Sequence, residues 1–403
     1  MHRNHYDVIV VGARCAGSPT AMLLARKGYR VLLVDRATFP SDTISTHLIH
    51  PPGVSLMKKW GLLDRLIGTG CPPIDTYNFD FGPFALSGNP GTEETPLAYA
   101  PRRTVLDKLL VDAAGEAGVE VREGLVVEDL LTEGDRVTGI RGHGKQGGPV
   151  SERARLVVGA DGLHSLVAKK VRADHYNDRP PLQASYYTYW SNLPMHGRFE
   201  AFDRGNRAFA AWPTNDDLTL VIAGWPIAEF ERNKSDIEGN YHKVLDLAPA
   251  FAARLGNAKR EERFVGTPVA NFFRKPFGPG WALVGDAGYN KDFITAQGIS
   301  DAFLDAEVCA GALHDSFAGA RPFDVAMASY QSTRDARVMP IFEFTCQFAA
   351  MAPPPPEMQQ LLGAIHGNRD AMDGFARVFA GVTSPAEFFS QENVGRIFAA
   401  AAH

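Results

Sequence analysis

Residues 6–35, YDVIVVGARCAGSPTAMLLARKGYRVLLVD, constrain the fold of this chain more than any other stretch. Residues 6–11 form a short apolar, β-branched run, which is typical of a buried parallel strand. A glycine turn follows, residues 18–27 have the apolar spacing of a helix, and residues 29–34 indicate a second strand. The stretch therefore predicts a βαβ unit with a glycine turn after its first strand.

The glycine turn is an imperfect dinucleotide-binding pattern. The motif G-x-G-x-x-G would place glycines at 12, 14 and 17, but position 14 is Arg14. Gly12 can still make the tight turn, and Gly17 can still let helix and strand pack closely. Amides at a helix start suit a pyrophosphate, and Asp35 follows at roughly the 20-residue spacing of a ribose-binding carboxylate. We interpret the unit as a dinucleotide site; the alternative is an ordinary turn followed by a surface aspartate.

Composition narrows the class of protein. The 403 residues suffice for two or three domains, and a net charge of −5 does not favour nucleic acid or an anionic membrane as partner. Four cysteines in so long a chain indicate a reducing compartment, and we interpret Cys15 as a small residue rather than a reactive thiol. No signal peptide or membrane span is recognisable. We expect a cytoplasmic monomer or homodimer.

Two further strand ends carry an aspartate beside a glycine. Asp161-Gly162 follows a predicted strand at 156–159, where Asp161 can either bond backbone amides of the first glycine turn or lie close to a phosphate chain. Gly285-Asp286 follows a strand at 281–284, where a ligand crevice is expected in such folds. The amides of 297–299 begin a predicted helix at 299–313 and can receive an anion.

Polar loops extend over this predicted nucleotide fold. Loop 43–50 carries His47, which is either a surface histidine or a contact near a cofactor's reactive ring, and His50, which we expect to be structural. We predict one helix over 51–66. Arg102 and Arg103 stand at the start of the next helix, where they indicate either a local anionic partner or a solvated pair.

The remaining chain differs in character. Residues 74–100 predict a hairpin-like excursion, and residues 180–270 predict an antiparallel sheet rich in aromatic residues. Such a sheet facing a nucleotide domain can form a large pocket. The candidate lining residues, each with core packing as its alternative, are Tyr187, Tyr189, Trp190, Phe209 and Trp212. Residues 330–403 are helical by pattern, and PPPP at 353–356 separates a cap that either covers the pocket or contacts another subunit.

The three strand-end motifs, in this order, resemble the FAD-dependent monooxygenase superfamily of the p-hydroxybenzoate hydroxylase type. The resemblance covers residues 1–330 and includes Arg103, Leu106, Asp107 and Leu110 of the predicted helix. Family members more often carry Gly at 14 and Glu at 35, and their third motif differs at Gly288, Tyr289, Phe293 and Ala296. The third loop also resembles those of geranylgeranyl-reductase-like and halogenase-like proteins. The halogenase signature W-x-W-x-I-P is missing from the sequence, which disfavours halogenation.

The resemblance implies an α/β fold: a Rossmann-like FAD-binding domain of the glutathione-reductase type, an antiparallel β-sheet substrate domain and a helical C-terminal region. We place the discontinuous FAD-binding domain at 1–73, 101–179 and 271–330. The substrate domain then comprises 74–100 and 180–270, and the helical cap comprises 331–403. The residues that we expect to bind FAD are Gly12, Ala13, Cys15, Ala16, Gly17, Asp35, Arg36, Thr46, Arg103, Val126, Asp161, Gly162, Asp286, Gln297, Gly298 and Ile299.

The resemblance also implies a chemistry. NAD(P)H, bound transiently, reduces FAD, and O2 then gives a flavin C4a-hydroperoxide that oxygenates a small organic substrate, by pocket composition an aromatic or polyketide-like one. Our candidate catalytic side chains are His47, Tyr187 and Tyr289. One alternative keeps FAD but reduces an isoprenoid-like double bond. The other is a flavin-binding or dinucleotide-binding module without catalysis.

Overall fold

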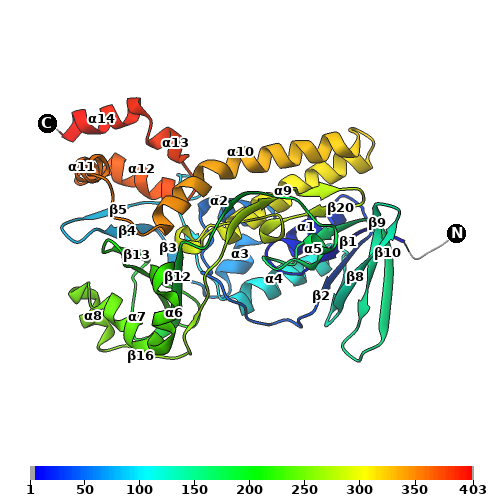
Figure 1. Ribbon diagram of the computed structural model, residues 1–403, viewed down its shortest axis with the longest axis horizontal. Helices are drawn as coiled ribbons and strands as arrows, with labels where there is room; N and C mark the ends of the chain where they lie inside the picture. The colour runs from blue at the N-terminus through cyan, green and yellow to red at the C-terminus, as the bar shows by residue number, and fades with distance from the viewer. Residues whose placement is uncertain (1–4, 402–403) are drawn as a thin grey trace.

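A mostly parallel sheet forms one half of the protein in the computed structural model, which describes residues 5–401 (Figure 1). The strands β7, β2, β1, β10 and β20 are parallel neighbours in that order, and β19 is antiparallel at the edge. Strands β8 and β9 extend β10 as an antiparallel flap. The bounds are β1 His5–Val11, β2 Val31–Asp35, β7 Glu120–Glu123, β8 Val126–Glu133, β9 Arg136–His143, β10 Pro149–Gly159, β19 Phe277–Gly278 and β20 Trp281–Leu283.

Both faces of this sheet are covered, as its β-branched strands predict. Val8 and Val10 of β1 belong to one hydrophobic cluster, whereas Ile9 and Val11 belong to another on the opposite face. The first cluster includes residues of α1, α2, α4 and α9, and the second includes residues of α5. These helices are α1 Gly17–Arg26, α2 Pro51–Lys59, α4 Arg103–Glu116, α5 Leu166–Lys170 and α9 Gly298–Phe317. The predicted βαβ unit is thus the centre of the first sheet.

A second sheet, order β16-β12-β15-β14-β13-β4-β5 with β17 also on β12, forms the other half. It is antiparallel, as predicted for 180–270, except where β13 pairs with β4 in parallel. The 74–100 excursion therefore joins this sheet. Its strands are β4 Thr76–Asp80, β5 Ala85–Gly88, β12 Gln183–Ser191, β13 Arg198–Asp203, β14 Ala208–Pro213, β15 Thr219–Pro226, β16 Lys259–Arg260 and β17 Val265–Gly266.

Short strands connect the two halves. A three-stranded sheet has the order β11-β18-β21, and β3 pairs with β6. Two 3₁₀ turns, η3 and η4, flank β21 immediately before α9. The bounds are β3 Pro73–Ile74, β6 Ala98–Tyr99, β11 His175–Arg179, β18 Asn271–Arg274, η3 Gly285–Ala287, β21 Tyr289–Asn290 and η4 Phe293–Thr295.

Helices cover both faces of the second sheet. Residues of α7 and α8 pack on one face, and the C-terminal helices α11–α14 gather over β4 and β5 (Figure 1). The long helix α10 runs beside α9 and crosses the boundary that we placed at 330–331, so the domain division stays a proposal. The bounds are η1 Ile227–Glu229, α6 Phe230–Asn233, η2 Lys234–Asp236, α7 Ile237–Leu245, α8 Pro249–Leu255, α10 Phe323–Ala349, α11 Pro356–Ile365, α12 Arg369–Phe379, α13 Pro385–Phe388 and α14 Gln391–Ala401.

The single helix predicted over 51–66 is wrong, because the structure has two helices there. Helix α2 ends at Lys59, and α3 (Leu63–Ile67) follows. Gly61 has a φ of 76°, and the Leu62 amide donates to the Met57 carbonyl, so the chain closes the first helix with a left-handed glycine. The interruption lets the Trp60 indole donate to Glu307 at 2.5 Å.

Among the helices of residues 5–401, none is long and apolar enough to cross a lipid bilayer.

Candidate active site

The three motifs meet at the carboxyl ends of the parallel strands. Gly12 has a φ of 102°, and a Cβ there would overlap the Ala160 carbonyl oxygen beside Asp161. A Cβ on Gly285 would lie 2.8 Å from the Cβ of Ala16. Backbone contacts therefore join the first motif to the second and to the third, and glycine is required at both junctions.

The N-terminus of α1 has the features of an anion-binding helix terminus. A Cβ on Gly17 would overlap the Gly12 carbonyl, so glycine lets helix and turn pack closely. Within residues 5–401, no side chain caps this helix terminus, which leaves its positive end open to a phosphate. Asp35 braces the turn, since its carboxylate accepts from the Ala13 amide at 2.7 Å and the Ala37 amide at 2.8 Å. Its contact with a ribose hydroxyl stays a prediction.

Arg14, which breaks the glycine motif, has a buried partner. Its guanidinium pairs with Asp107 of α4 and donates to the Ser41 hydroxyl at 2.9 Å. Asp107 also accepts from Arg103 Nε at 3.0 Å and is fully buried. Burial raises the pKa of the Cys15 thiol to about 12, which agrees with a small packing residue. The turn thus places two guanidinium groups around one carboxylate beside the predicted pyrophosphate position.

The expected bond from Asp161 to the first glycine turn is wrong. Its carboxylate accepts instead from the Ser165 hydroxyl at 2.5 Å and from the Leu166 amide at 2.6 Å. These bonds brace the start of α5, because a strand-end aspartate is nearest to the amides of its own following helix. The neighbouring Gly162 has a φ of 75° and needs no side-chain space.

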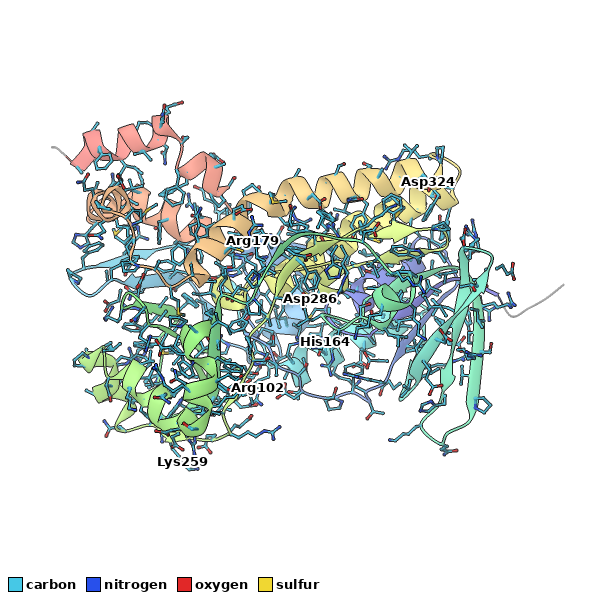
Figure 2. The ribbon with its side chains drawn as sticks, viewed as in Figure 1. Arg102, His164, Arg179, Lys259, Asp286 and Asp324 are labelled. Atoms are coloured by element: carbon cyan, nitrogen blue, oxygen red, sulfur yellow. The ribbon has the colours of Figure 1, made fainter. Side chains whose placement is uncertain are left out.

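Asp286 lies in the middle of the molecule, as Figure 2 shows. The surrounding protein raises its pKa to about 6, although the Arg103 guanidinium opposes the shift and the residue keeps an exposed surface. A carboxylate so placed is ready to accept hydrogen bonds from ligand hydroxyls. Gln297 lies at the start of α9, where its side-chain amide donates to the Phe379 carbonyl at 2.7 Å. A hydrogen bond therefore joins the predicted cofactor-binding segment at the start of α9 to the C-terminal cap.

Two of the three candidate catalytic side chains lie side by side. The ring centroids of His47 and Tyr187 are 6.4 Å apart, and His47 Nε2 hydrogen-bonds the Tyr189 hydroxyl. His47 is buried with a φ of 61°, and its Nδ1 has no partner among the described residues. Burial and the guanidinium groups of Arg103 and Arg102 hold its pKa well below the usual range, so the imidazole is neutral. The surface-histidine interpretation is wrong.

Tyr289 belongs to a different cluster. Its hydroxyl donates to Asp301 of α9 at 2.8 Å and contacts the Lys291 ammonium, which pairs with the same carboxylate. His50 is structural, as predicted: its ring bonds the Tyr77 hydroxyl at 2.7 Å and the Thr295 carbonyl at 3.0 Å. No spacing pattern in the sequence indicates the Lys291–Asp301 ion pair, because the pair forms only when the loop folds back on α9.

The arginines at the start of α4 have local anionic partners, so the solvated-pair alternative is wrong. Arg102 pairs with Glu262 at 2.7 Å, and its guanidinium carbon lies 4.1 Å from the Tyr189 ring centroid. Arg103 is buried against Asp107. The other predicted cofactor residues are spread around the site: Ala13, Ala16 and Ile299 are buried, Arg36 and Gly298 are exposed, and Thr46 and Val126 are intermediate.

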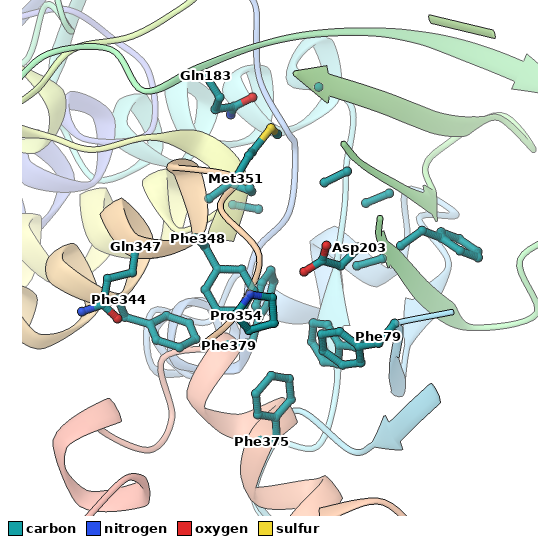
Figure 3. Close-up of a pocket in the computed structure, with 18 of the residues that line it drawn as sticks. Phe79, Gln183, Asp203, Phe344, Gln347, Phe348, Met351, Pro354, Phe375 and Phe379 are labelled. Carbon is teal, nitrogen blue, oxygen red and sulfur yellow. The ribbon is translucent and has the colours of Figure 1, made fainter. Parts of the chain in front are cut away.

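A large cavity lies between the second sheet and the C-terminal cap (Figure 3). Its volume is about 710 Å³, and its wall combines sheet residues with the end of α10, the proline segment and α12. It reaches Thr46 and Ala296, which flank the predicted flavin-binding segments. Its aromatic wall includes Phe79, Phe199, Phe344, Phe348, Phe375 and Phe379.

The predicted lining is partly wrong. Phe209 and Trp212 do line the cavity, but Tyr187, Tyr189 and Trp190 do not. Trp190 packs on the opposite face of the sheet, since side chains alternate along β12. The sequence missed the C-terminal phenylalanines as individual lining residues, because only the tertiary fold brings the cap against the sheet.

Comparison with known proteins gives relatives of two kinds. Digeranylgeranylglycerophospholipid reductase 2 of Methanococcoides burtonii is 27% identical over 77% of this chain and 74% of the relative. The 6-methylpretetramide 4-monooxygenase of Streptomyces rimosus is 28% identical, over 75% of this chain and 73% of the relative. Both alignments span most of each protein.

A solved structure shows the same fold. The myxobacterial chondrochloren halogenase, an FAD-dependent halogenase, superposes with a TM-score of 0.81 and 24% identity, over 99% of this chain and 97% of that one.

The family and the geometry agree on the cofactor. The glycine cradle, the open start of α1 and the exposed carboxyl of Asp286 fit FAD, with a pyrophosphate at the turn and hydroxyls at the aspartate. The family described as FAD binding domain matches residues 5–239, more than half of the chain. This protein therefore belongs to the FAD binding domain family and is an FAD-dependent oxidoreductase with the p-hydroxybenzoate hydroxylase type of fold.

Proposed function

We propose that the protein is an NAD(P)H-using monooxygenase that oxygenates an aromatic, polyketide-like organic substrate. The observation that carries this proposal is the apolar cavity of about 710 Å³, which reaches the segments around the predicted flavin position at Thr46 and Ala296. Its size suits a molecule of several fused rings. A relative of similar length is a monooxygenase named for 6-methylpretetramide, which supports the same class of reaction.

The overall reaction inserts one oxygen atom. The substrate C–H bond, O2, NAD(P)H and a proton give C–OH, water and NAD(P)+, and FAD supplies the electron transfer and oxygen activation when bound. The protein's own task is to hold the substrate against the flavin and to keep water out. Phe379 does both, since its ring lines the cavity and its carbonyl accepts the bond from Gln297 beside the flavin-facing loop.

His47 is our candidate for the proton transfers. Its imidazole is neutral, one nitrogen bonds Tyr189, and Nδ1 is buried without a protein partner in residues 5–401. Such a nitrogen can take or return a proton, and the neighbouring Thr46 lines the cavity, whereas the His47 ring itself does not. Tyr187 lies against the same ring and accepts from the Ser45 amide at 3.2 Å, which positions the loop that carries His47.

A reductase that saturates an isoprenoid-like double bond is the second candidate. The similarity to the digeranylgeranylglycerophospholipid reductase favours it, and an apolar cavity also suits an isoprenoid chain. In that reaction NAD(P)H and a proton add two hydrogen atoms across C=C, and O2 is not consumed.

The experiment measures the product mass. The FAD-loaded enzyme is screened under air against polycyclic phenols and isoprenoid lipids for acceleration of NAD(P)H oxidation, and products of active compounds are analysed by mass spectrometry with 18O2 (heavy oxygen). A monooxygenase adds one labelled oxygen atom and consumes O2 when substrate is present. A gain of two hydrogen atoms without label identifies the reductase instead, and flavin that neither class of compound affects contradicts both.

A further inference from the structure

A row of small residues crosses the sheet at the floor of the cavity. Ser185 of β12 pairs with Gly224 of β15, and Gly224 pairs with Ala208 of β14. A Cβ on Gly224 would overlap the Ser185 hydroxyl, and it would lie 2.8 Å from Gln183 Oε1 and 3.0 Å from the methyl carbon of Met351. The glycine therefore keeps two buried polar groups open to the cavity, with a residue of the cap segment opposite.

These polar groups form a hydrogen-bond chain with one direction. The Gln183 side-chain nitrogen donates to Asp292 at 2.7 Å, and the same carboxylate oxygen accepts from the Ile294 amide at 2.9 Å. Since an ionised carboxylate only accepts, the nitrogen of the Gln183 amide must face Asp292. The amide oxygen is left for Ser185, whose hydroxyl donates to it at 2.5 Å.

The donor direction along these hydrogen bonds determines whether the Ser185 hydroxyl can donate to a ligand or only accept from it. Its single proton is used on Gln183, so only oxygen lone pairs remain for the cavity. Gln183 and Ser185 line the cavity in an otherwise mostly aromatic and aliphatic wall, and both are at least 95% buried. A buried acceptor of this kind selects strongly for a ligand that can donate to it.

We propose that Ser185, held by Gln183 and Asp292, is the specificity-determining residue of the cavity. It accepts a hydrogen bond from a hydroxyl or amino group on an otherwise apolar, multi-ring substrate. The inference rests on the proposed function in that the cavity is the substrate site, and it adds the polarity of the group recognised. Asp292 is a positioning residue, because it acts through the orientation of the Gln183 amide.

The test compares two ligands that differ only in the donor. Phenanthrol and its methyl ether are titrated by calorimetry into the FAD-loaded enzyme without NAD(P)H, at about pH 8, where carboxylates are ionised. The wild type should bind the phenol roughly tenfold tighter than the ether, as expected for one buried hydrogen bond. The double variant Ser185→Ala/Gln183→Met should bring the ratio to about one, because Ser185→Ala alone would leave the Gln183 amide oxygen as a free acceptor.

A second variant distinguishes the effect of the hydrogen bond between Ser185 and Gln183 from the effect of the Ser185 hydroxyl itself. Gln183→Met keeps the side-chain length but frees the Ser185 proton, so the ether should gain affinity and the preference should fall severalfold. The matched control is Asp203→Asn, at the other end of the same cross-strand row, which should leave the ratio unchanged.

The proposal is overturned by equal binding of phenol and ether to the wild type, by an unchanged ratio in the double variant Ser185→Ala/Gln183→Met, or by a ratio lost in the Asp203→Asn control. Failure of both ligands to bind also contradicts it, because the apolar wall should hold both. Since no reductant is present, these results do not depend on whether the enzyme oxygenates or reduces. Failure of the proposed function would instead appear in the product mass.

Discussion

Around the glycine turn, buried charged groups and backbone amides surround the predicted cofactor position, whereas the cavity wall is mostly aromatic and aliphatic. The charged region tolerates a lost motif residue because Arg14 has Asp107 as partner. The cavity wall contains no comparable buried ion pair among its described residues, and we propose that its specificity depends on a few polar groups such as Ser185. We expect the cofactor and the substrate to bind in different regions, so the substrate site can vary between relatives without changing the cofactor site.

The strongest test of the charged region is Gly12→Val. A Cβ at 12 would overlap the Ala160 carbonyl, and the positive φ adds backbone strain, so we expect loss of bound FAD. The flavin absorbance per protein after purification measures it. Gly115→Ala, inside α4 with open space around it, is the matched control and should retain flavin. Yellow Gly12→Val protein would contradict the role of this turn.

The corresponding test of the apolar region is Phe379→Ala. Phe379 is 3% exposed and its ring packs 4.9 Å from that of Phe79, so removal should cost about 3–5 kcal/mol of the free energy of unfolding. Water should also reach the cavity, and more NAD(P)H should be oxidised without product. Denaturant unfolding and the ratio of product to NAD(P)H measure the two effects. If Phe379→Ala still forms one product molecule per NAD(P)H oxidised, the cap does not exclude water from the cavity.

Arg14→Gly sharpens the comparison, because it restores the literal glycine motif. If the motif alone mattered, the variant would bind FAD better. We expect roughly tenfold weaker binding instead, since Asp107 loses one of its two guanidinium partners beside the pyrophosphate position. Titration of apoprotein with FAD gives the dissociation constant. Tighter binding would mean that Arg14 is only tolerated.

The smallest expected effect concerns Asp286→Asn. The folded-state pKa of about 6 is raised above the ordinary value of 3.8, so the folded apoprotein favours the protonated acid, and this stability is lost as pH rises from about 4 to 6. Above that window the asparagine variant should melt at a higher temperature than wild-type apoprotein, while retaining less FAD. Melting curves across this range measure the difference. An increase in melting temperature that does not depend on pH would indicate a change in packing rather than the loss of a charge.

The βαβ unit, the order of the three motifs and the aromatic second sheet all follow from the amino-acid sequence alone. These features are local: buried β-branched strands, helical spacing and glycines at turns are all encoded within short segments. The same locality explains why the FAD-dependent class follows from the motifs.

Which side chains line the cavity and the predicted cofactor site depends on the tertiary fold. Arg14 breaks the glycine motif, yet its guanidinium pairs with Asp107 of α4, and the Asp161 carboxylate bonds its own helix rather than the first turn. Tyr187 and Tyr189 do not line the cavity. Phe344 and Phe379 of the C-terminal segments do, although they lie hundreds of residues from the glycine turn in the sequence. Such contacts depend on long-range packing, for which a single sequence carries no periodic or spacing signal.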